Sequence, residues 1–206
     1  MGRRDHNSRS ESPDLGDKFV AGLGSQTPPS DKMNVTIASR QRVRKINRRL
    51  LKQITTALLA DLKIEKAELG IHLVAIQEIT RLNEKFLHHK GSTDVITFDY
   101  HTEGRVGSPL PAARSGALRT GLRKASPRRG ARPTLHGEIV ICVNEAVLQA
   151  RKFGTSWQSE TARYVVHGVL HLLGHDDLRA TARCKMKREE NRLLREITRR
   201  FPLSKL

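Results

Sequence analysis

Cysteines, aromatic residues and long apolar runs are all scarce in this sequence, and each shortage excludes a class of protein. The two cysteines, Cys142 and Cys184, lie far apart and neither has a second cysteine at metal-ligand spacing, so a disulfide framework or a cysteine-based zinc site is not expected. No stretch approaches the roughly 20 apolar residues of a membrane span. No apolar run follows the basic residues at the start of the chain, so no secretory signal is expected either. A reducing cytoplasm fits all of these absences.

Acidic residues are also in the minority. The 206 residues include 38 Lys and Arg against 21 Asp and Glu, which gives a formal net charge of +17. This excess favours polyanionic partners, with nucleic acid or a ribosomal surface as the first expectation and an anionic membrane as the second, although high charge also serves solubility. Because aromatic residues make up only 4 % of the chain, base stacking is not expected to be the main contact with RNA.

Two segments have the composition of disordered chain. Residues 1–32 are rich in Ser, Pro, Gly and Asp and are interpreted as a disordered tail. The segment from about 101 to 135 contains eight Lys or Arg against one acidic residue and no periodicity. It is interpreted as a disordered basic insertion, which either contacts RNA or is a neutral addition. The chain length fits one domain, which is assigned to residues 33–206.

The hydrophobic pattern of that domain predicts strands and helices. Short β-type runs are expected from Met33 onward and over Leu69–Ile76, Asp94–Phe98 and Glu138–Val143. Helical spacing is found over Arg40–Leu62, Gln77–Phe86, Asn144–Phe153, Trp157–Leu173 and Leu178–Phe201. This order predicts the α/β (α+β) class, with a single compact domain in which one mixed sheet is covered by helices.

The first predicted helix has a basic outer face at its start. The residues that form it are Arg40, Arg42, Arg44, Lys45, Arg48 and Arg49. Such a face is either solvated or in contact with RNA phosphate, and the sequence leaves both interpretations open. The last predicted helix is basic as well, with a buried stripe expected at Met186, Leu193, Leu194 and Ile197.

The segment HGVLHLLGHDD, residues 167–177, contains the residues suited to catalysis. His167 and His171 lie four residues apart, so on a helix they are separated by about 40° around the axis and roughly 6 Å along it, and both imidazoles can reach one ion. A histidine pair can also belong to a core, but two unpaired imidazoles in so apolar a helix would be costly. Gly174 can take a positive φ and turn the chain back toward the ion. A metal site on this central helix is therefore expected.

Candidates for a third ligand follow Gly174 directly. Two imidazoles and one further N or O ligand leave a position for water, and bound zinc lowers the pKa of that water to about 7. The spacing resembles the zinc-binding turn of metzincin-like proteins, which favours Asp177, whereas His175 is the alternative because imidazole is the commoner zinc ligand. One Zn²⁺ per chain, held by His167, His171 and Asp177, is the resulting prediction.

Gly168 argues against proteolysis. A metallopeptidase of this kind places Glu directly after the first histidine as its general base, and glycine offers no acid or base. The base is instead expected to be the metal-activated water itself or Asp176, a nearby carboxylate that can also orient a ligand imidazole. Hydrolysis of a bond other than a peptide bond is therefore indicated, with His167, His171 and Asp176 as the catalytic residues.

Three stretches resemble the YbeY endoribonucleases, also called ribosomal RNA maturation factors. They are LNEKFLHHKGSTDVITF (82–98), HGEIVICVNEA (136–146) and HGVLHLLGHDD (167–177), and with their spacing they cover most of residues 33–177. The resemblance implies a compact α/β fold with one metal, usually zinc, in a cytoplasmic hydrolase that cleaves single-stranded RNA. It also implies a role in small-subunit ribosomal RNA 3′-end maturation and ribosome quality control, with the small ribosomal subunit as partner.

His167 and His171 match the first two metal ligands of this family, and two other positions depart from its pattern. Asp177 stands where the family usually has a third histidine, and its carboxylate can still bind zinc. Leu87 stands where the family usually has an arginine suited to RNA phosphate. Either the phosphate contact moves to residues 88–90, or the nuclease activity is weaker.

Thr93 and Asp94 match the family's TDV motif, although such a pair at the start of a strand is often only a turn or cap. Two functions compete with the nuclease. A non-catalytic ribosome assembly factor with a structural metal fits the missing arginine and the net charge of +17. A metallohydrolase of small phosphoesters would need no basic arms, and its turnover would be nearly insensitive to salt.

Overall fold

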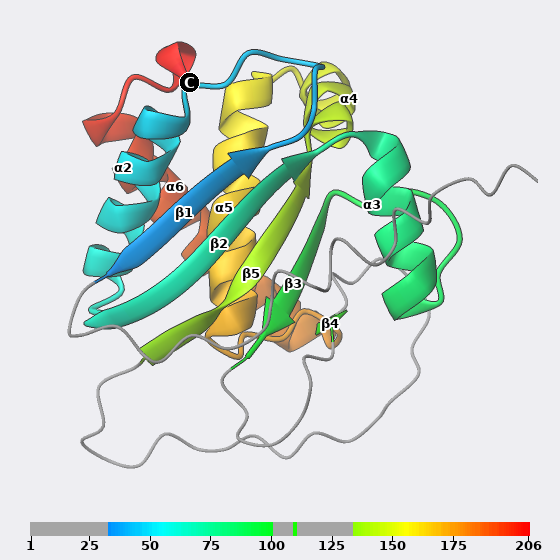
Figure 1. Ribbon diagram of the computed structural model, residues 1–206. Coiled ribbons are helices and arrows are strands. Elements are labelled where there is room, and N and C mark those ends of the chain that lie inside the picture. The colour runs from blue at the N-terminus through cyan, green and yellow to red at the C-terminus, as the bar shows by residue number, and fades with distance from the viewer. Residues whose placement is uncertain (1–32, 101–108, 111–133) are drawn as a thin grey trace, which may run out of the picture. The chain divides into compact units, whose positions relative to one another are not determined.

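The computed structural model describes residues 33–100, 109–110 and 134–206. The proposed tail lies outside these residues, and so does the proposed insertion apart from one short strand and the start of the next. The elements, in chain order, are β1 (Asn34–Ser39), α2 (Arg48–Asp61), β2 (Lys66–Val74), α3 (Ile76–Leu82), the π-helical turn η1 (Asn83–Leu87), β3 (Val95–Asp99), β4 (Pro109–Leu110), β5 (Thr134–Cys142), α4 (Val143–Phe153), α5 (Trp157–Leu172), α6 (Ala180–Arg200) and the 3₁₀ turn η2 (Leu203–Lys205) (Figure 1).

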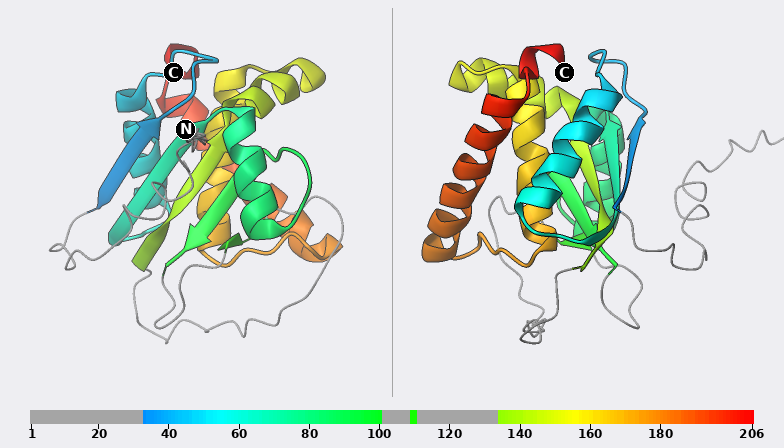
Figure 2. Two further views of the ribbon diagram at one scale, coloured as in Figure 1. Left: turned by 45° about the vertical axis from the view of Figure 1, so that its right-hand side comes forward. Right: turned by 90° about the vertical axis from the view of Figure 1, so that its left-hand side faces the viewer.

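The described strands form one mixed sheet in the order β1-β2-β5-β3-β4. β1, β2 and β5 are parallel, whereas β3 runs antiparallel to β5 and β4 runs antiparallel to β3. Helices α2 and α5 cover one face of this sheet, and α6 packs against the outer side of α5 (Figure 1, Figure 2). The predicted fold class, a mixed sheet covered by helices, is confirmed.

The hydrophobic core lies between the sheet and these helices. Along β2 the side chains alternate, so that Leu69 and Ile71 are buried while Glu68 is exposed. Helix α5 is enclosed by the sheet on one side and by α6 on the other, which explains why it is apolar around most of its circumference. Its fully buried apolar residues are Ala162, Val165, Val166, Val169 and Leu170.

Two glycines allow close packing around α5. A Cβ atom on Gly168 would lie 2.8 Å from Cγ2 of Ile139, a fully buried residue of β5. A Cβ atom on Gly137 of β5 would lie 2.5 Å from the backbone oxygen of Phe98 in β3. Both distances are shorter than ordinary contacts of a Cβ atom, so the packed structure leaves no room for a side chain at either position. Gly168, which argues against a peptidase because glycine offers no acid or base, is thus also required by the packing of α5 on β5.

The helix predicted over Arg40–Leu62 begins only at Arg48, so the prediction was wrong over its first eight positions. The reason is the side chain of Gln41, which closes a turn. Its Oε1 accepts hydrogen bonds from the backbone N–H groups of Val43 at 2.6 Å and Arg44 at 3.0 Å, and its Nε2 donates to the Arg44 carbonyl at 2.8 Å. The basic residues before Arg48 therefore lie on a loop.

Other boundaries differ from the prediction by a few residues. β2 begins at Lys66, earlier than Leu69, and β5 begins at Thr134, inside the segment assigned to the insertion. The helix predicted over Gln77–Phe86 begins at Ile76 and ends in the π-helical turn η1. No helix in the described ranges is both long and apolar enough to cross a membrane.

Candidate metal centre

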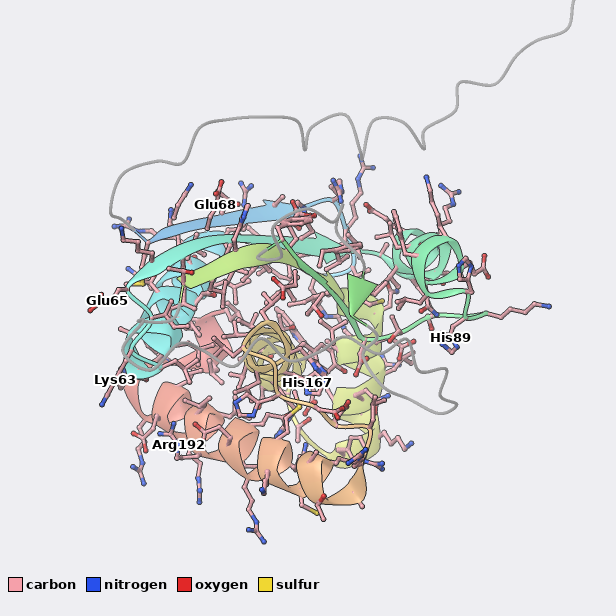
Figure 3. All side chains as sticks on the ribbon, turned by 90° about the horizontal axis from the view of Figure 1, so that it is seen from below. Lys63, Glu65, Glu68, His89, His167 and Arg192 are labelled. Carbon is pink, nitrogen blue, oxygen red and sulfur yellow. The ribbon has the colours of Figure 1, made fainter. Side chains whose placement is uncertain are left out.

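The two histidines of α5 point their Nε2 atoms at each other. Nε2 of His167 lies 3.0 Å from Nε2 of His171, and the two rings are nearly perpendicular, with an interplanar angle of 86°. The four-residue spacing on a regular helix produces this approach, as predicted. Figure 3 shows His167 between the sheet and α6. His171 is the more buried of the two, at 6 % exposure.

Gly174 turns the chain back toward the histidines. Its φ is +83°, in the left-handed region that favours glycine. Its N–H donates to the His171 carbonyl at 2.8 Å, and the N–H of His175 donates to the Leu170 carbonyl at 3.0 Å, so the end of α5 closes on itself. The chain then brings Asp177 beside the histidines. One ligand atom from each of His167, His171 and Asp177 lies within 4.8 Å of the other two.

The outer ring nitrogens of both histidines face hydrogen-bond acceptors. Nδ1 of His167 lies 3.1 Å from Oε2 of Glu190, and Nδ1 of His171 lies 3.1 Å from the carbonyl oxygen of His175. An acceptor at Nδ1 favours the tautomer with its hydrogen there, which leaves the Nε2 lone pair for a ligand. Two such lone pairs 3.0 Å apart repel each other unless a cation lies between them.

The donor set fits a zinc ion. Zinc takes imidazole nitrogen and carboxylate oxygen at about 2.0–2.2 Å, and an ion at that distance from both Nε2 atoms fits two nitrogens 3.0 Å apart. Burial, and then the neighbouring His167, lower the pKa of His171, against weaker opposing effects of Asp177, the His175 carbonyl and Asp176. His171 is therefore neutral at neutral pH, as a metal ligand must be. The group His167, His171 and Asp177 can hold one metal ion.

Glu190, on α6, was not predicted from the sequence. It is 4 % exposed, and its carboxylate accepts hydrogen bonds from Arg163 on α5 and from Lys187 as well as from His167. Burial alone would raise the pKa of Glu190, but the hydrogen bonds from His167, Lys187 and Arg163 lower it to about 2. Glu190 is thus an anion that orients His167 from the next layer of helices.

A signal for Glu190 was present in the helical pattern. Glu190 lies four residues after Met186 and three before Leu193, within the buried stripe predicted for the last helix, and all three residues are buried. A carboxylate in the buried phase of an amphipathic helix needs a partner, so it indicates a polar site. No pattern in the sequence indicated which side chain that partner is.

The other two candidate residues of the turn, His175 and Asp176, lie outside the group of His167, His171 and Asp177. The His175 side chain is exposed and does not join the metal group, and its backbone carbonyl holds His171 instead. Asp176 is half-buried, and its Oδ1 accepts the N–H of Leu178 at 2.8 Å, which closes the turn before α6. The structure therefore places Asp176 beside the group rather than within it.

The residues matched near the TDV motif have local hydrogen bonds. Oδ1 of Asp94 accepts the N–H of Val95 at 3.1 Å and the Thr93 hydroxyl at 3.2 Å, so this pair caps the start of β3. Leu87 is half-buried at the end of η1, and residues 88–90 are exposed, with His88 at a φ of +56°.

Comparison with known proteins identifies the family of this chain. The family model described as Endoribonuclease YbeY matches residues 30–198. A protein named Endoribonuclease YbeY from Myxococcus xanthus is 36 % identical over 148 residues, which is 72 % of this chain but only 42 % of that protein. Proteins with the same name from Salinibacter ruber and Elusimicrobium minutum are 33 % and 30 % identical, over 63 % and 72 % of this chain and 69 % and 87 % of their own lengths.

Among solved structures, the solution structure of a Thermotoga maritima protein matches with a TM-score of 0.49 and 20 % identity, over 82 % of this chain and 95 % of that one. The family assignment comes from the sequence matches alone. Because the family model matches residues 30–198, which is most of the chain, the chain belongs to the Endoribonuclease YbeY family.

Proposed function

We propose that this protein is a zinc-dependent endoribonuclease that cleaves phosphodiester bonds in single-stranded RNA. We further propose that it acts in the cytoplasm, in 3′-end maturation of small-subunit ribosomal RNA and in ribosome quality control. The observation that supports the metal dependence is the group of His167, His171 and Asp177, whose ligand atoms lie within 4.8 Å of one another. Membership of the Endoribonuclease YbeY family supports RNA as the substrate.

Each residue of the centre has a defined task in this proposal. A zinc ion held by His167, His171 and Asp177 would polarise a phosphoryl oxygen and lower the pKa of water. Glu190 and the His175 carbonyl keep the hydrogens of the two imidazoles on Nδ1, so both Nε2 atoms are available as ligands. Three protein ligands would leave room at such an ion for the reacting group, as catalytic zinc sites do.

Asp176 is proposed as the base. Its Oδ1 is fixed by the N–H of Leu178, and its second oxygen can accept a proton from the attacking water. A carboxylate next to the third ligand replaces the glutamate of peptidases, for which the packing at Gly168 has no room. The net charge of +17 supports a polyanionic substrate over a small phosphoester.

The alternative is a non-catalytic assembly factor that uses its metal only for structure. Leu87 favours it, because an apolar side chain at this position cannot contact a phosphate. The two functions differ in what the metal does, so metal content and RNA cleavage must be measured on the same samples.

The test uses the purified protein and the variants His171→Ala, Asp177→Ala and His175→Ala. Zinc content is measured by mass spectrometry, and cleavage is measured on a labelled single-stranded RNA that contains the 3′ end of precursor small-subunit ribosomal RNA. We expect His171→Ala and Asp177→Ala to lose zinc and cleavage together, while His175→Ala, the control in the same turn, retains both. Cleavage that survives loss of the zinc would refute the metal mechanism. Zinc binding with no cleavage by the unaltered protein would favour the assembly factor.

A further inference from the structure

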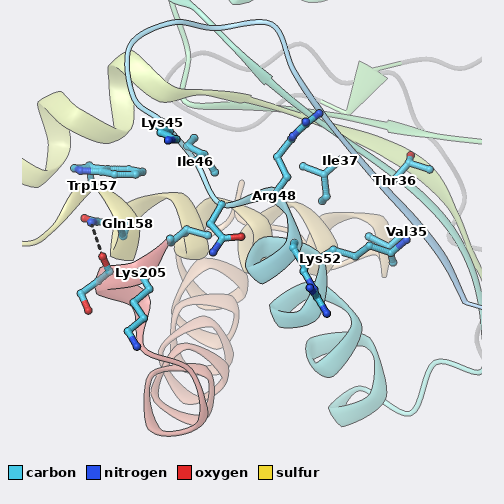
Figure 4. A pocket seen from close by; sticks show the side chains of 14 residues that line it. Val35, Thr36, Ile37, Lys45, Ile46, Arg48, Lys52, Trp157, Gln158 and Lys205 are labelled. Atoms are coloured by element: carbon cyan, nitrogen blue, oxygen red, sulfur yellow. Dashed lines mark hydrogen bonds between the residues drawn. The ribbon is translucent and has the colours of Figure 1, made fainter.

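A second site lies at the other end of α5. A groove of about 1020 Å³ runs between β1, the start of α2 and the C-terminal segment (Figure 4). Trp157, the first residue of α5, lies on its wall, ten residues before His167. At 1.5 Å per residue this places the groove about 15 Å along the helix from the metal centre. The groove is therefore separate from the centre but within reach of one extended substrate.

The charged side chains that line the groove are all basic. Lys45, Arg48, Arg49, Lys52 and Lys205 contribute to its walls, all five are exposed, and no Asp or Glu lines it. None of the five forms an ion pair with a described acidic residue. The first turn of α2 also contains no acidic residue, although the positive end of the helix dipole favours one there. This excess charge is unfavourable for folding and favourable for binding a polyanion.

A second basic surface of the protein has acidic partners for some of its basic side chains. The groove between α5 and α6 is lined by several arginines, among them Arg163 and Arg199. Arg163 is paired with Glu190, and Arg199 is paired with Glu196 at 3.1 Å. Its positive charge is thus partly neutralised within the protein. The groove at Trp157 is the better candidate for an anionic ligand.

Trp157 indicates which class of polyanion fits the groove. It is the single tryptophan of the chain, it is partly exposed, and its indole lies on the wall beside Gln158 (Figure 4). Apolar side chains, including Ile37 and Ile46, also line the groove. Cations along a groove that also holds an aromatic ring are the combination with which proteins hold single-stranded nucleic acid, the cations on phosphates and the ring against a base.

We propose that this groove binds a single-stranded segment of the RNA substrate, with phosphates on Arg48, Arg49 and Lys52 and one base stacked on Trp157. The inference rests on the proposed function, because it takes the bound strand to be part of the RNA that is cleaved. The groove then acts as an anchor at a fixed distance from the metal centre. It raises affinity for RNA long enough to reach both sites, without touching the reacting phosphate.

Trp157 supplies a direct probe, because no other tryptophan contributes to the fluorescence. The full chain is titrated with a 12-nucleotide oligouridylate that carries phosphorothioate linkages to slow hydrolysis at phosphorus, and quenching should report stacking. The variant Arg48→Gln/Arg49→Gln/Lys52→Gln should bind roughly ten-fold more weakly. Its slope of log affinity against log salt should fall by about 2, since each phosphate contact on a single strand contributes about 0.7.

The matched control removes the same charge elsewhere. Lys63, Arg151 and Lys152 are exposed and line neither groove, so the triple change of these residues to Gln should alter affinity by less than about two-fold. Equal weakening by both triple variants would show only general charge attraction and would overturn the proposal. Stronger changes in Trp157 fluorescence with phosphatidylglycerol vesicles than with RNA would assign the groove to a membrane and overturn it as well.

The ring itself is tested by two substitutions. Trp157→Phe keeps an aromatic face and should retain the affinity for RNA within a few-fold. Trp157→Leu occupies the same position with an apolar side chain that has no aromatic face, and its affinity for RNA should fall roughly ten-fold. Affinity is measured by the anisotropy of labelled RNA, and circular dichroism verifies that both variants fold. Equal affinity of the two variants would remove the stacking part of the proposal and so overturn it.

Cleavage kinetics separate failure of the groove from failure of the nuclease. On a long RNA the triple groove variant should raise KM about ten-fold and leave kcat within two-fold, because the groove holds substrate without contacting the reacting atoms. Unchanged KM and binding in that variant, beside loss of cleavage in His171→Ala, would refute the groove and leave the nuclease intact. RNA binding in the groove by a protein that cleaves no RNA would refute the proposed function and support the groove as an RNA site.

Discussion

The buried carboxylate of Glu190, which packs against α5 from α6, has three partners, whereas the basic side chains of the groove at the N-terminal end of α5 have no acidic partner in the described structure. Glu190 contacts His167, Arg163 and Lys187. Arg48 and Lys52 form no ion pair with any residue that the structure describes, and both are exposed. A buried charge must be neutralised, because water cannot solvate it, but an exposed one need not be. The same helix can therefore contribute to a buried candidate metal site along its second half and to a surface with excess charge at its start.

This comparison predicts opposite effects of substitution at the two ends of α5. Removing a charge or adding bulk beside the metal centre should destabilise the fold. Removing a charge from the groove should stabilise the fold while RNA binding is weakened. The expected effects fall in size from the packed centre to the exposed surface.

The largest effect is expected for Gly168→Glu, which introduces the glutamate of metallopeptidases. Its Cβ would lie 2.8 Å from Cγ2 of the fully buried Ile139, and a carboxylate would enter the core. We expect a loss of more than about 4 kcal/mol in the free energy of unfolding, measured by urea denaturation. The exposed control Gln53→Glu on α2 should change it by less than about 0.5 kcal/mol. A stable Gly168→Glu protein would mean that α5 does not lie so close to β5.

The next largest loss of stability is expected for substitutions of Glu190. Glu190→Ala leaves Arg163, Lys187 and His167 without their shared anion and should cost about 3 kcal/mol of stability and 10–100-fold in zinc affinity. Glu190→Gln keeps an acceptor for Nδ1 of His167 and should lose less of both. Zinc affinity is measured by competition with a chelator and stability by thermal unfolding with the metal removed. Equal zinc affinity in all three proteins would exclude a role of Glu190 in orienting His167.

Arg48→Glu is expected to raise the free energy of unfolding, by less than the two previous substitutions lower it. An acidic residue in the first turn of α2 interacts favourably with the helix dipole and lowers the repulsion in the groove, so stability should rise by about 0.5–1 kcal/mol at low salt. Arg151→Glu, in the last turn of α4, is the mirror control and should lower stability by a similar amount. Both differences should shrink in 1 M salt, and a loss of stability in Arg48→Glu would contradict the assignment of uncompensated charge.

The smallest effect is expected for Arg192→Gln. Arg192 is paired with Glu189 on the exposed side of α6. Glu189 directly precedes the buried Glu190 in the sequence. Exposed pairs contribute little, so the free energy of unfolding should change by less than about 0.5 kcal/mol in urea denaturation. A change as large as that in Glu190→Ala would show that the number of ion pairs, rather than their burial, governs stability at this end of the molecule.

Much of the candidate centre could be predicted because it is local in the chain. His167, His171, Gly174 and Asp177 span 11 residues, and helix geometry together with one positive φ is enough to bring them together. The mixed sheet also followed from local hydrophobic patterns. The start of α2 did not, because a single side chain, Gln41, makes hydrogen bonds that hydrophobic spacing does not indicate.

The sequence by itself determined the histidine pair, its helix, the turn after it and the excess of positive charge, because these depend on neighbours within a few residues or on composition alone. The tertiary structure alone decided that Glu190 meets His167, that Gly168 touches Ile139, and that Trp157 shares a groove with the start of α2. Each of these contacts joins residues on different elements. Which elements become neighbours is fixed by packing over the whole core, and no local pattern contains that information.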